Sequence, residues 1–187
     1  MQTQTDDPFA LLITWTCYGT WLPGDARGYV SNTHLPGGGW SPKENIPGTP
    51  YTEDNPLTRH QTGKLLAQAP TWLSVEQAHC AALELVKATA KRNWRILRAA
   101  LMANHVHVVI RDCPDDGPAV RRVLKGTTQA KLSDLVGENR SWWTRGGSDR
   151  YLHGDNAILG AMNYVAGQKY KLVEITDMDV FIVAKSS

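Results

Sequence analysis

Apolar and polar positions alternate with two different periods along this chain, and together the two periods predict a mixed α+β fold. Short apolar segments rich in β-branched and aromatic residues are typical of strands, whereas apolar residues at three- and four-residue spacing are typical of helices. The predicted strands are residues 8–19, 93–104 and 105–112, with a further short strand or hairpin around Gly146 and Gly147. The predicted helices are residues 75–92, 119–136 and 156–173.

These elements follow one another as β-α-β-β-α-β-α, with a short tail. The order is close to the ferredoxin-like arrangement, in which helices cover one face of an antiparallel sheet. Ser74 and Gln77 have the spacing of a capping box before the first helix, and Asp155 is a good N-cap for the last one. We therefore predict an α+β fold: a ferredoxin-like antiparallel sheet with helices packed on one face, plus a C-terminal helix.

Length and composition favour a single globular domain spanning residues 1–187, in which 42% of residues are hydrophobic and 20% are charged. Gly, Pro, Asn and Thr dominate residues 20–70, which we interpret as a long loop insertion. The three cysteines form no CxxC pair, which indicates reduced thiols. The first residues contain neither the positive charges nor the apolar run of a signal peptide, and no apolar run is long enough to span a membrane. We therefore expect a cytoplasmic protein.

Two histidines stand two residues apart in the apolar run "LMANHVHVVI". Because side chains alternate along a strand, His105, His107 and Val109 should share one face, and the residues between them should enter the core. The two imidazoles would then lie roughly 7 Å apart at the backbone, close enough to bind one ion. Packing, a structural metal and a catalytic metal are all compatible with this pattern, and packing is the commonest role for such a pair.

The last predicted helix carries a second candidate group. Tyr164 and Gln168 are four residues apart and lie on one helix face, which Ala157 and Ala161 continue with small side chains. If this face docked over the histidines, two ring nitrogens and an amide oxygen would surround one cation, with the tyrosine hydroxyl beside it. The alternative is that Tyr164 is an aromatic at the edge of the core and Gln168 is a surface residue.

The motif "NHVHVVI", followed later by "NYVAGQ", resembles the HUH single-stranded DNA endonucleases. More narrowly, it is similar to the IS200-like tyrosine transposases, including the REP-associated type. The similarity extends to "LLITWTCYGTWLPGDARGYV", "VRRVLKGTTQAKL" and "WWTRGG", and it covers most of the chain apart from residues 32–70. The insertion at residues 20–70 departs from the family pattern, so details of DNA recognition do not carry over.

The resemblance implies that His105, His107 and Gln168 bind a divalent metal, Mg²⁺ or Mn²⁺, and that Tyr164 is the catalytic nucleophile. It implies a DNA transposase that cuts and rejoins single-stranded DNA at hairpins through a 5′-phosphotyrosine intermediate. The alternatives are a domesticated protein that binds DNA hairpins without cutting them, and a small domain whose histidine pair is structural. Relatives include monomers and homodimers that exchange the tyrosine helix, so either state is compatible with the sequence.

Charge supports a nucleic-acid partner, because residues 87–150 contain thirteen Lys and Arg residues against six Asp and Glu residues. Solvated helix faces are the alternative explanation. Trp142 and Trp143 could stack on bases, although core packing is the commoner role. The candidate phosphate contacts are Arg121, Arg122, Lys125, Lys131 and Arg145.

Overall fold

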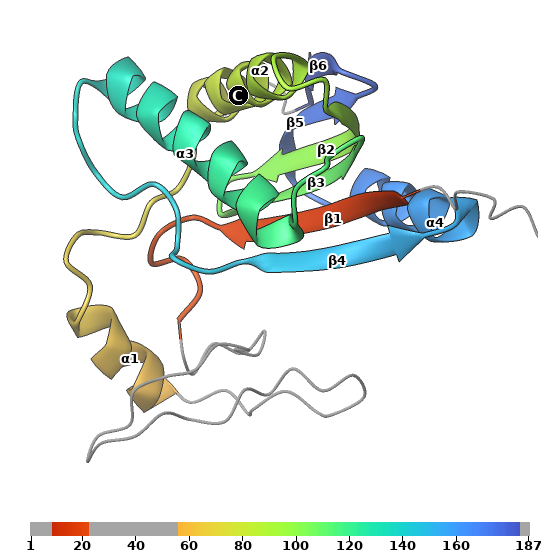
Figure 1. The fold of residues 1–187 in the computed structure, drawn as a ribbon. Helices are drawn as coiled ribbons and strands as arrows, with labels where there is room; N and C mark the ends of the chain where they lie inside the picture. Colours follow the sequence, from red (N-terminus) through yellow and green to blue (C-terminus); the bar gives the residue numbers. More distant parts are fainter. Residues whose placement is uncertain (1–8, 23–55, 184–187) are drawn as a thin grey trace, which may run out of the picture.

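The computed structural model describes residues 9–22 and 56–183, and within them six strands form one antiparallel sheet (Figure 1). The strand order across the sheet is β4-β1-β3-β2-β5-β6. The strands are β1 (Phe9–Thr16), β2 (Arg95–Met102), β3 (His105–Arg111), β4 (Ser148–His153), β5 (Lys171–Thr176) and β6 (Asp179–Ile182). The helices are α1 (Pro56–Lys64), α2 (Val75–Ala90), α3 (Gly117–Val136) and α4 (Asp155–Ala166). The predicted α+β class is confirmed.

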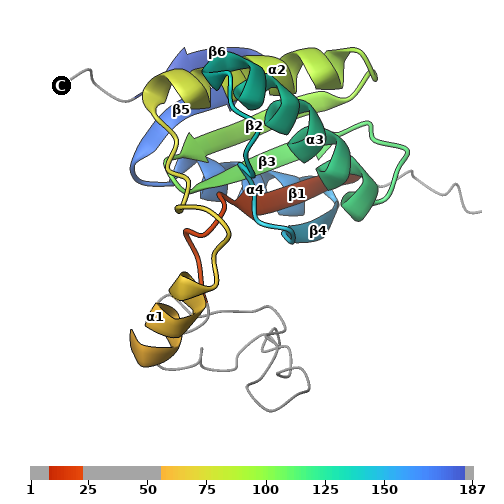
Figure 2. The same ribbon diagram turned by 90° about the vertical axis from the view of Figure 1, so that its left-hand side faces the viewer.

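Different helices cover the two faces of the sheet. Helices α2 and α3 lie on one face, and α4 lies on the opposite face (Figures 1 and 2). Leu11 and Val108 belong to the large core under α2 and α3, whereas Ala10 and Val109 belong to a smaller cluster under α4. Strand alternation therefore sends neighbouring residues of β1 and β3 to opposite faces, as predicted for β3.

The connections follow the predicted order from β1 to β4. Strands β1 and β2, which are joined through α2, lie on either side of β3, and β3 and β4, which are joined through α3, lie on either side of β1. The short connection at residues 103–104 makes β2 and β3 a hairpin. This interleaving brings β1 and β3, which are far apart in the sequence, together at the centre of the sheet.

Helix ends follow the local sequence signals. The capping box is present: the Ser74 hydroxyl accepts from the Gln77 amide, and the Gln77 side chain accepts from the Ser74 amide. The Asp116 carboxylate caps α3 at the amide of Ala119, and Gly137 ends this helix in the left-handed region with φ of 70°. Glycine has no Cβ to clash in that conformation, so the helix stops there.

The C-terminal part differs from the prediction. The sequence predicts a last helix over residues 156–173, but α4 ends at Ala166, and β5 begins at Lys171. Val173 and Ile175 alternate with more exposed neighbours and are buried, which is a strand pattern inside the segment predicted as helix and tail. The N-cap of α4 is Gly154 rather than Asp155, which is the first helical residue and stabilises the positive end of the helix dipole.

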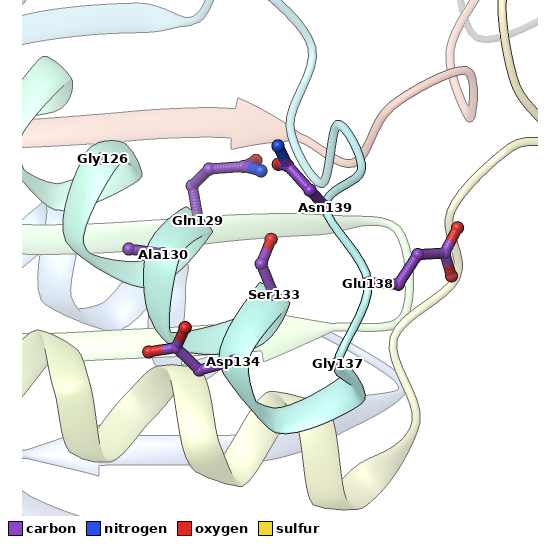
Figure 3. Close-up of a pocket in the computed structure, with 8 residues that line it drawn as sticks. All are labelled: Gly126, Gln129, Ala130, Ser133, Asp134, Gly137, Glu138 and Asn139. Atoms are coloured by element: carbon purple, nitrogen blue, oxygen red, sulfur yellow. The ribbon is translucent and has the colours of Figure 1, made fainter.

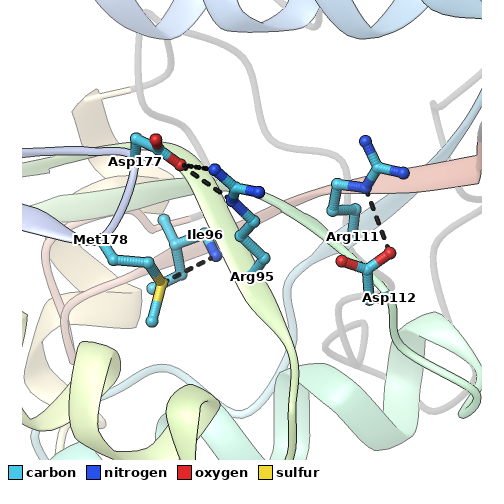
Figure 4. Close-up of polar contacts among 6 residues, drawn as sticks. All are labelled: Arg95, Ile96, Arg111, Asp112, Asp177 and Met178. Atoms are coloured by element: carbon cyan, nitrogen blue, oxygen red, sulfur yellow. Dashed lines mark hydrogen bonds and ion pairs between the residues drawn. The ribbon is translucent and has the colours of Figure 1, made fainter.

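The turn between β5 and β6 is tied to the start of β2 (Figure 4). The Asp177 carboxylate accepts from the Arg95 guanidinium at 2.7 Å, and the Met178 sulfur accepts from the amide of Ile96 at 3.2 Å. Asp177 and Met178 both have positive φ, at 48° and 74°. The tail expected at the end of the chain is thus a β-hairpin that extends the sheet.

The insertion predicted at residues 20–70 contains one regular element in its described part, the helix α1, and residues 23–55 lie outside the described residues. Helix α1 stands apart from the sheet in both views (Figures 1 and 2). The Tyr18 hydroxyl accepts from the amide of Ala67 at 3.0 Å and so fixes the exit of this segment. Within the described ranges, none of the helices combines the length and the apolar character that a membrane crossing needs.

Candidate active site

The candidate site lies on the sheet face that α4 covers. In the antiparallel registers, Thr14 of β1 and Ala100 of β2 both stand opposite His107, and Thr16 stands opposite His105. Directly paired residues of antiparallel strands project from the same face, so these side chains surround the two histidines. The imidazoles of β3 therefore lie between the threonine hydroxyls of β1 and the small side chain of Ala100 on β2.

The two imidazoles lie close together. Their ring centroids are 4.9 Å apart, and the ring planes are nearly perpendicular, at 86°. Each Nδ1 atom has an oxygen neighbour at 2.7 Å: the Thr14 hydroxyl for His107 and the Asn104 side-chain oxygen for His105. With Nδ1 engaged in this way, Nε2 is the nitrogen of each ring that would bind a cation.

Burial controls the charge of His107. Its side chain is only 6% exposed, and burial, followed by the proximity of His105, lowers the pKa of His107 to about 4. A neutral imidazole keeps a lone pair on one nitrogen, whereas a protonated imidazole has none. His107 is therefore in the form that binds a metal at neutral pH, and its charged form is strongly disfavoured.

Helix α4 brings Tyr164 to this histidine pair. The ring centroids of Tyr164 and His107 are 5.4 Å apart with an angle of 78° between the planes, and Tyr164 is 53% exposed. Ile158, Ala161 and Val165 dock the helix on the sheet. Because Ala161 and Ala100 are small and belong to the same cluster, the helix can approach the strands closely. Within this single chain, tyrosine and histidines form one site.

Gln168 lies two residues beyond the end of α4, in the connection to β5. Its side-chain amide nitrogen donates to the carbonyl oxygen of Tyr164 at 3.2 Å, so the glutamine stays beside the turn that carries the tyrosine. Tyr170 differs from Tyr164: it is 90% exposed and has a positive φ of 59°. Of these two tyrosines, only Tyr164 is in ring contact with a site histidine.

The available donor atoms suit a divalent cation with open coordination positions. In the part of the chain that the structure describes, no group of three His, Cys, Asp or Glu side chains could hold a metal. The two imidazoles would be protein ligands at this site, the sequence resemblance adds the amide oxygen of Gln168, and water and substrate would complete the shell. Imidazole suits Mn²⁺ better than Mg²⁺, and open positions are what a Lewis-acid site requires.

The structure gives the predicted basic residues of α3 a different setting from the histidines. Helix α3 lies on the opposite face of the sheet, where the guanidinium of Arg121 pairs with Asp149. The Lys125 ammonium donates to the carbonyl oxygens of Thr144 and Gly146, and burial, followed by the charge of Arg121, lowers the pKa of Lys125 to about 8. Lys125 therefore holds the loop before β4 in place, and Arg121 is paired with β4 itself.

Arg122, Lys131 and Arg145 are exposed. Lys131 lines a shallow depression between α2 and α3 together with Glu84, far from the α4 face. Arg145 is different, because its neighbour Thr144 pairs with Thr16 at the end of β1 that stands opposite His105. Lys125 also reaches this segment through Thr144 but is partly buried, so Arg145 is the exposed cation among the five predicted phosphate contacts that follows Thr144 at the histidine end of β1.

Trp142 and Trp143 are core residues, which excludes them as stacking platforms. They are 2% and 7% exposed, and their indole nitrogens donate to the hydroxyls of Ser133 and Thr128. A depression near this anchor is lined by polar side chains of α3 and the following loop (Figure 3). Gln129 uses its amide there to bind the backbone of Arg140 and Trp142. A side chain of this depression therefore binds the loop that follows α3, and the histidines are not among the residues that line the depression.

Three residues near the site are not predicted from the sequence: Thr14, Asn104 and Arg150. Arg150 is exposed and stands opposite Leu12 in the register, so it projects from the α4 face. The alternation in "LLITWT" is a usable signal for Thr14, because polar Thr14 and Thr16 recur every second residue among apolar ones. Arg150 gives no comparable signal, since its neighbourhood depends on the pairing of β4 with β1.

No protein-family model matches this chain, and no curated protein is significantly similar to it in sequence. The residues of the site and their geometry are therefore the basis for inferring its function.

Proposed function

We propose that this protein is a metal-dependent endonuclease and strand transferase for single-stranded DNA, of the HUH tyrosine transposase type. The observation that carries the proposal is the ring contact between Tyr164 and His107, with His105 4.9 Å from His107 on the same strand face. Tyr164 is half exposed, so a large substrate can reach it, whereas His107 is buried and neutral. An accessible nucleophile beside a preformed pair of cation ligands is what phosphodiester cleavage requires.

Tyr164 would act as the nucleophile. Its phenolic oxygen attacks the phosphorus of a DNA phosphodiester, a bond between that oxygen and phosphorus forms, and the bond from phosphorus to the 3′ oxygen breaks. The phenolic proton leaves to water, and the released 3′ oxygen takes up a proton from water. The 5′-phosphotyrosine link keeps the phosphate reactive, so a second 3′-hydroxyl can displace the tyrosine and rejoin the DNA.

His105, His107 and Gln168 would hold the divalent cation, Mg²⁺ or Mn²⁺. Such an ion supplies charge neutralisation for the scissile phosphate and lowers the cost of ionising a tyrosine. The protein's own contribution is positional. Ile158 and Val165 anchor α4 on the sheet, so Tyr164 is held beside the histidines before substrate arrives. Preorganisation of this kind reduces the entropy that the reaction must lose.

The substrate would be single-stranded DNA that carries a hairpin, met in the cytoplasm and on the nucleoid. Exposed Arg150 projects from the α4 face, and exposed Arg145 follows Thr144 at the end of β1 opposite His105, so we propose both as phosphate contacts. Lys125 would act indirectly, by fixing the loop that carries Arg145, and Arg121 by pairing with Asp149 of β4, the strand that follows this loop. Because α4 packs on its own sheet, the proposed site is complete in one chain, as a monomer or within each subunit of a homodimer.

Covalent capture tests the proposal. The protein is incubated with hairpin-bearing single-stranded oligonucleotides and Mn²⁺, and a DNA–protein adduct is sought by denaturing gel and mass spectrometry. We expect an adduct for the wild type and for Tyr170→Phe, but none for Tyr164→Phe. Tyr170 is a matched control because it is a nearby exposed tyrosine without the histidine contact. An adduct that persists in Tyr164→Phe would sink the assignment of the nucleophile.

A domesticated protein that binds DNA hairpins without cutting them is the second candidate. It keeps the exposed cations of the histidine face but does not need the tyrosine. Tight hairpin binding with no adduct and no nicked product, in Mg²⁺ and in Mn²⁺, would favour this candidate over cleavage.

A further inference from the structure

Each histidine of the site has an oxygen partner at its Nδ1 atom. The Thr14 hydroxyl lies 2.7 Å from Nδ1 of His107, and the Asn104 side-chain oxygen lies 2.7 Å from Nδ1 of His105. The partners come from two different elements, β1 and the β2–β3 hairpin. In both histidines an oxygen atom contacts Nδ1, and this repetition suggests that the two oxygen partners have the same role.

The chemistry of the Asn104 contact fixes the position of one proton. An amide oxygen only accepts hydrogen bonds, so Nδ1 of His105 must carry the hydrogen. In a neutral imidazole, a proton on Nδ1 leaves the lone pair on Nε2. Asn104 is itself well anchored, because its carbonyl oxygen accepts from the amide of Cys17 at 2.8 Å and from the Thr20 hydroxyl at 3.2 Å.

The Thr14 hydroxyl can donate or accept, so its contact with His107 is compatible with a hydrogen on Nδ1. Thr14 stands directly opposite His107 in the β1–β3 register, and strand pairing holds its backbone. When Nδ1–H of His107 donates to this hydroxyl, the Nε2 lone pair is free to bind a cation, and the ring can no longer rotate without losing a buried hydrogen bond. Leaving the Nδ1–H group of His107 without a hydrogen-bond partner is costly, because this histidine is only 6% exposed.

We infer that Thr14 and Asn104 are positioning residues that hold His107 and His105 as Nδ1–H tautomers, so that both Nε2 lone pairs are presented to one divalent cation. The inference uses the proposed function only for the identity of the ligand, a divalent cation. Outer partners of metal-binding histidines commonly act in this way, and removing one typically lowers metal affinity tenfold to a hundredfold.

The tautomers can be measured without metal or DNA. Two-bond ¹H–¹⁵N correlation spectra of the imidazole rings, recorded at pH 8 with chelator, report which nitrogen of His105 and His107 is protonated. We expect Nδ1–H for both rings in the wild type. Thr14→Val keeps the shape of the side chain without the hydroxyl and should shift His107 toward Nε2–H. Asn104→Ala should do the same for His105.

Conservative variants separate positioning from folding. Thr14→Ser keeps a hydroxyl and Asn104→Asp keeps an acceptor, so both should retain the wild-type tautomers. The affinity for Mn²⁺ alone, measured by electron paramagnetic resonance, should fall about tenfold or more in Thr14→Val and Asn104→Ala and stay within about threefold in Thr14→Ser. Urea unfolding of each variant shows whether the fold is intact.

The outcomes distinguish this inference from the proposed function. Nε2–H tautomers in the wild type, or unchanged tautomers and Mn²⁺ affinity in Thr14→Val and Asn104→Ala, would overturn the inference even if the protein cleaves DNA. The expected tautomers and Mn²⁺ affinities, together with no covalent adduct on any hairpin oligonucleotide, would support the inference while the proposed cleavage fails.

Discussion

The two faces of the central sheet are built from the same strands, yet they differ in nearly every physical property. The face under α2 and α3 contains large apolar side chains such as Ile13, Trp15 and Leu101, all at most 1% exposed. The face under α4 contains small residues such as Ala10 and Ala100, and next to them the histidines. Two long helices cover the first face, and one short helix covers part of the second.

The difference shows how a fold can separate stability from chemistry. Period-two alternation lets each central strand put one side chain into a dense core and the next into a partly open polar site. The first face buries most of the large apolar side chains, so the second face is free to hold groups that a core would not tolerate. Substitutions and pH changes on each face can test this contrast, and the largest response is expected in the core.

The core face should respond most strongly to truncation. Leu124→Ala removes a fully buried side chain between α3 and the sheet and should lower the free energy of unfolding by about 3 kcal/mol. Leu159→Ala is the matched control on α4, where the leucine is 56% exposed, and it should change that free energy by less than about 0.5 kcal/mol. Urea unfolding measures both. Equal effects would mean that the two faces do not differ in this way.

Acid should reveal the buried imidazole of the other face. A histidine takes up a proton near pH 6.5 in the unfolded chain, whereas burial lowers the pKa of His107 to about 4 in the folded protein. Between these values the unfolded state binds more protons, so the free energy of unfolding should fall as pH drops from 6.5 to 4, by at most about 3 kcal/mol.

His107→Gln is the reference for that measurement, because glutamine does not titrate. Urea unfolding with chelator at pH 7 and at pH 4.5 gives the pH dependence of each protein, and the wild type should lose more stability than the variant. The same slope in both proteins would show that His107 is not buried in its neutral form.

The small side chains under α4 should not tolerate enlargement. Ala161 is 7% exposed against the sheet, so Ala161→Leu should cost about 1–3 kcal/mol of unfolding free energy and displace Tyr164 from His107, with loss of the DNA adduct. Gly160→Ala on the same helix meets no atom within 4 Å and should instead stabilise the protein by about 0.5–1 kcal/mol. Calorimetry and the adduct assay would show whether the two changes behave alike.

The exposed ion pair between the start of β2 and the β5–β6 turn should be least sensitive. Arg95 and Asp177 form an ion pair at 2.7 Å with side chains that are 55% and 59% exposed, so Arg95→Ala should change the free energy of unfolding by less than about 1 kcal/mol (Figure 4). Arg98→Ala is the comparison, because it removes the guanidinium that pairs with Glu174, whose side chain is only 14% exposed. Its cost should be larger, and a smaller cost than that of Arg95→Ala would contradict this ranking.

Local sequence patterns predict much of this fold. The capping box at Ser74 and Gln77 and the alternation around His105 and His107 are predicted correctly, because both depend only on residues close in sequence. The prediction for the C-terminal part is wrong because the helical period of α4 runs without interruption into Val173. Strand β5 pairs with both β2 and β6, and the pairing with distant β2 cannot be read from neighbouring residues, although Val173 and Ile175 alternate as in a strand.

Backbone geometry fixes the periods of strands and helices, so the sequence alone specifies which residues share a strand face or a helix turn. Tertiary packing is what brings Tyr164 to His107 and the Thr14 hydroxyl to Nδ1 of that ring. It also brings Arg121 to Asp149 of β4 and Lys125 to the loop before that strand. Most of these contacts join different elements, and strand pairing and helix docking set their distances. The chemistry of this protein therefore depends on packing that the sequence encodes but does not display.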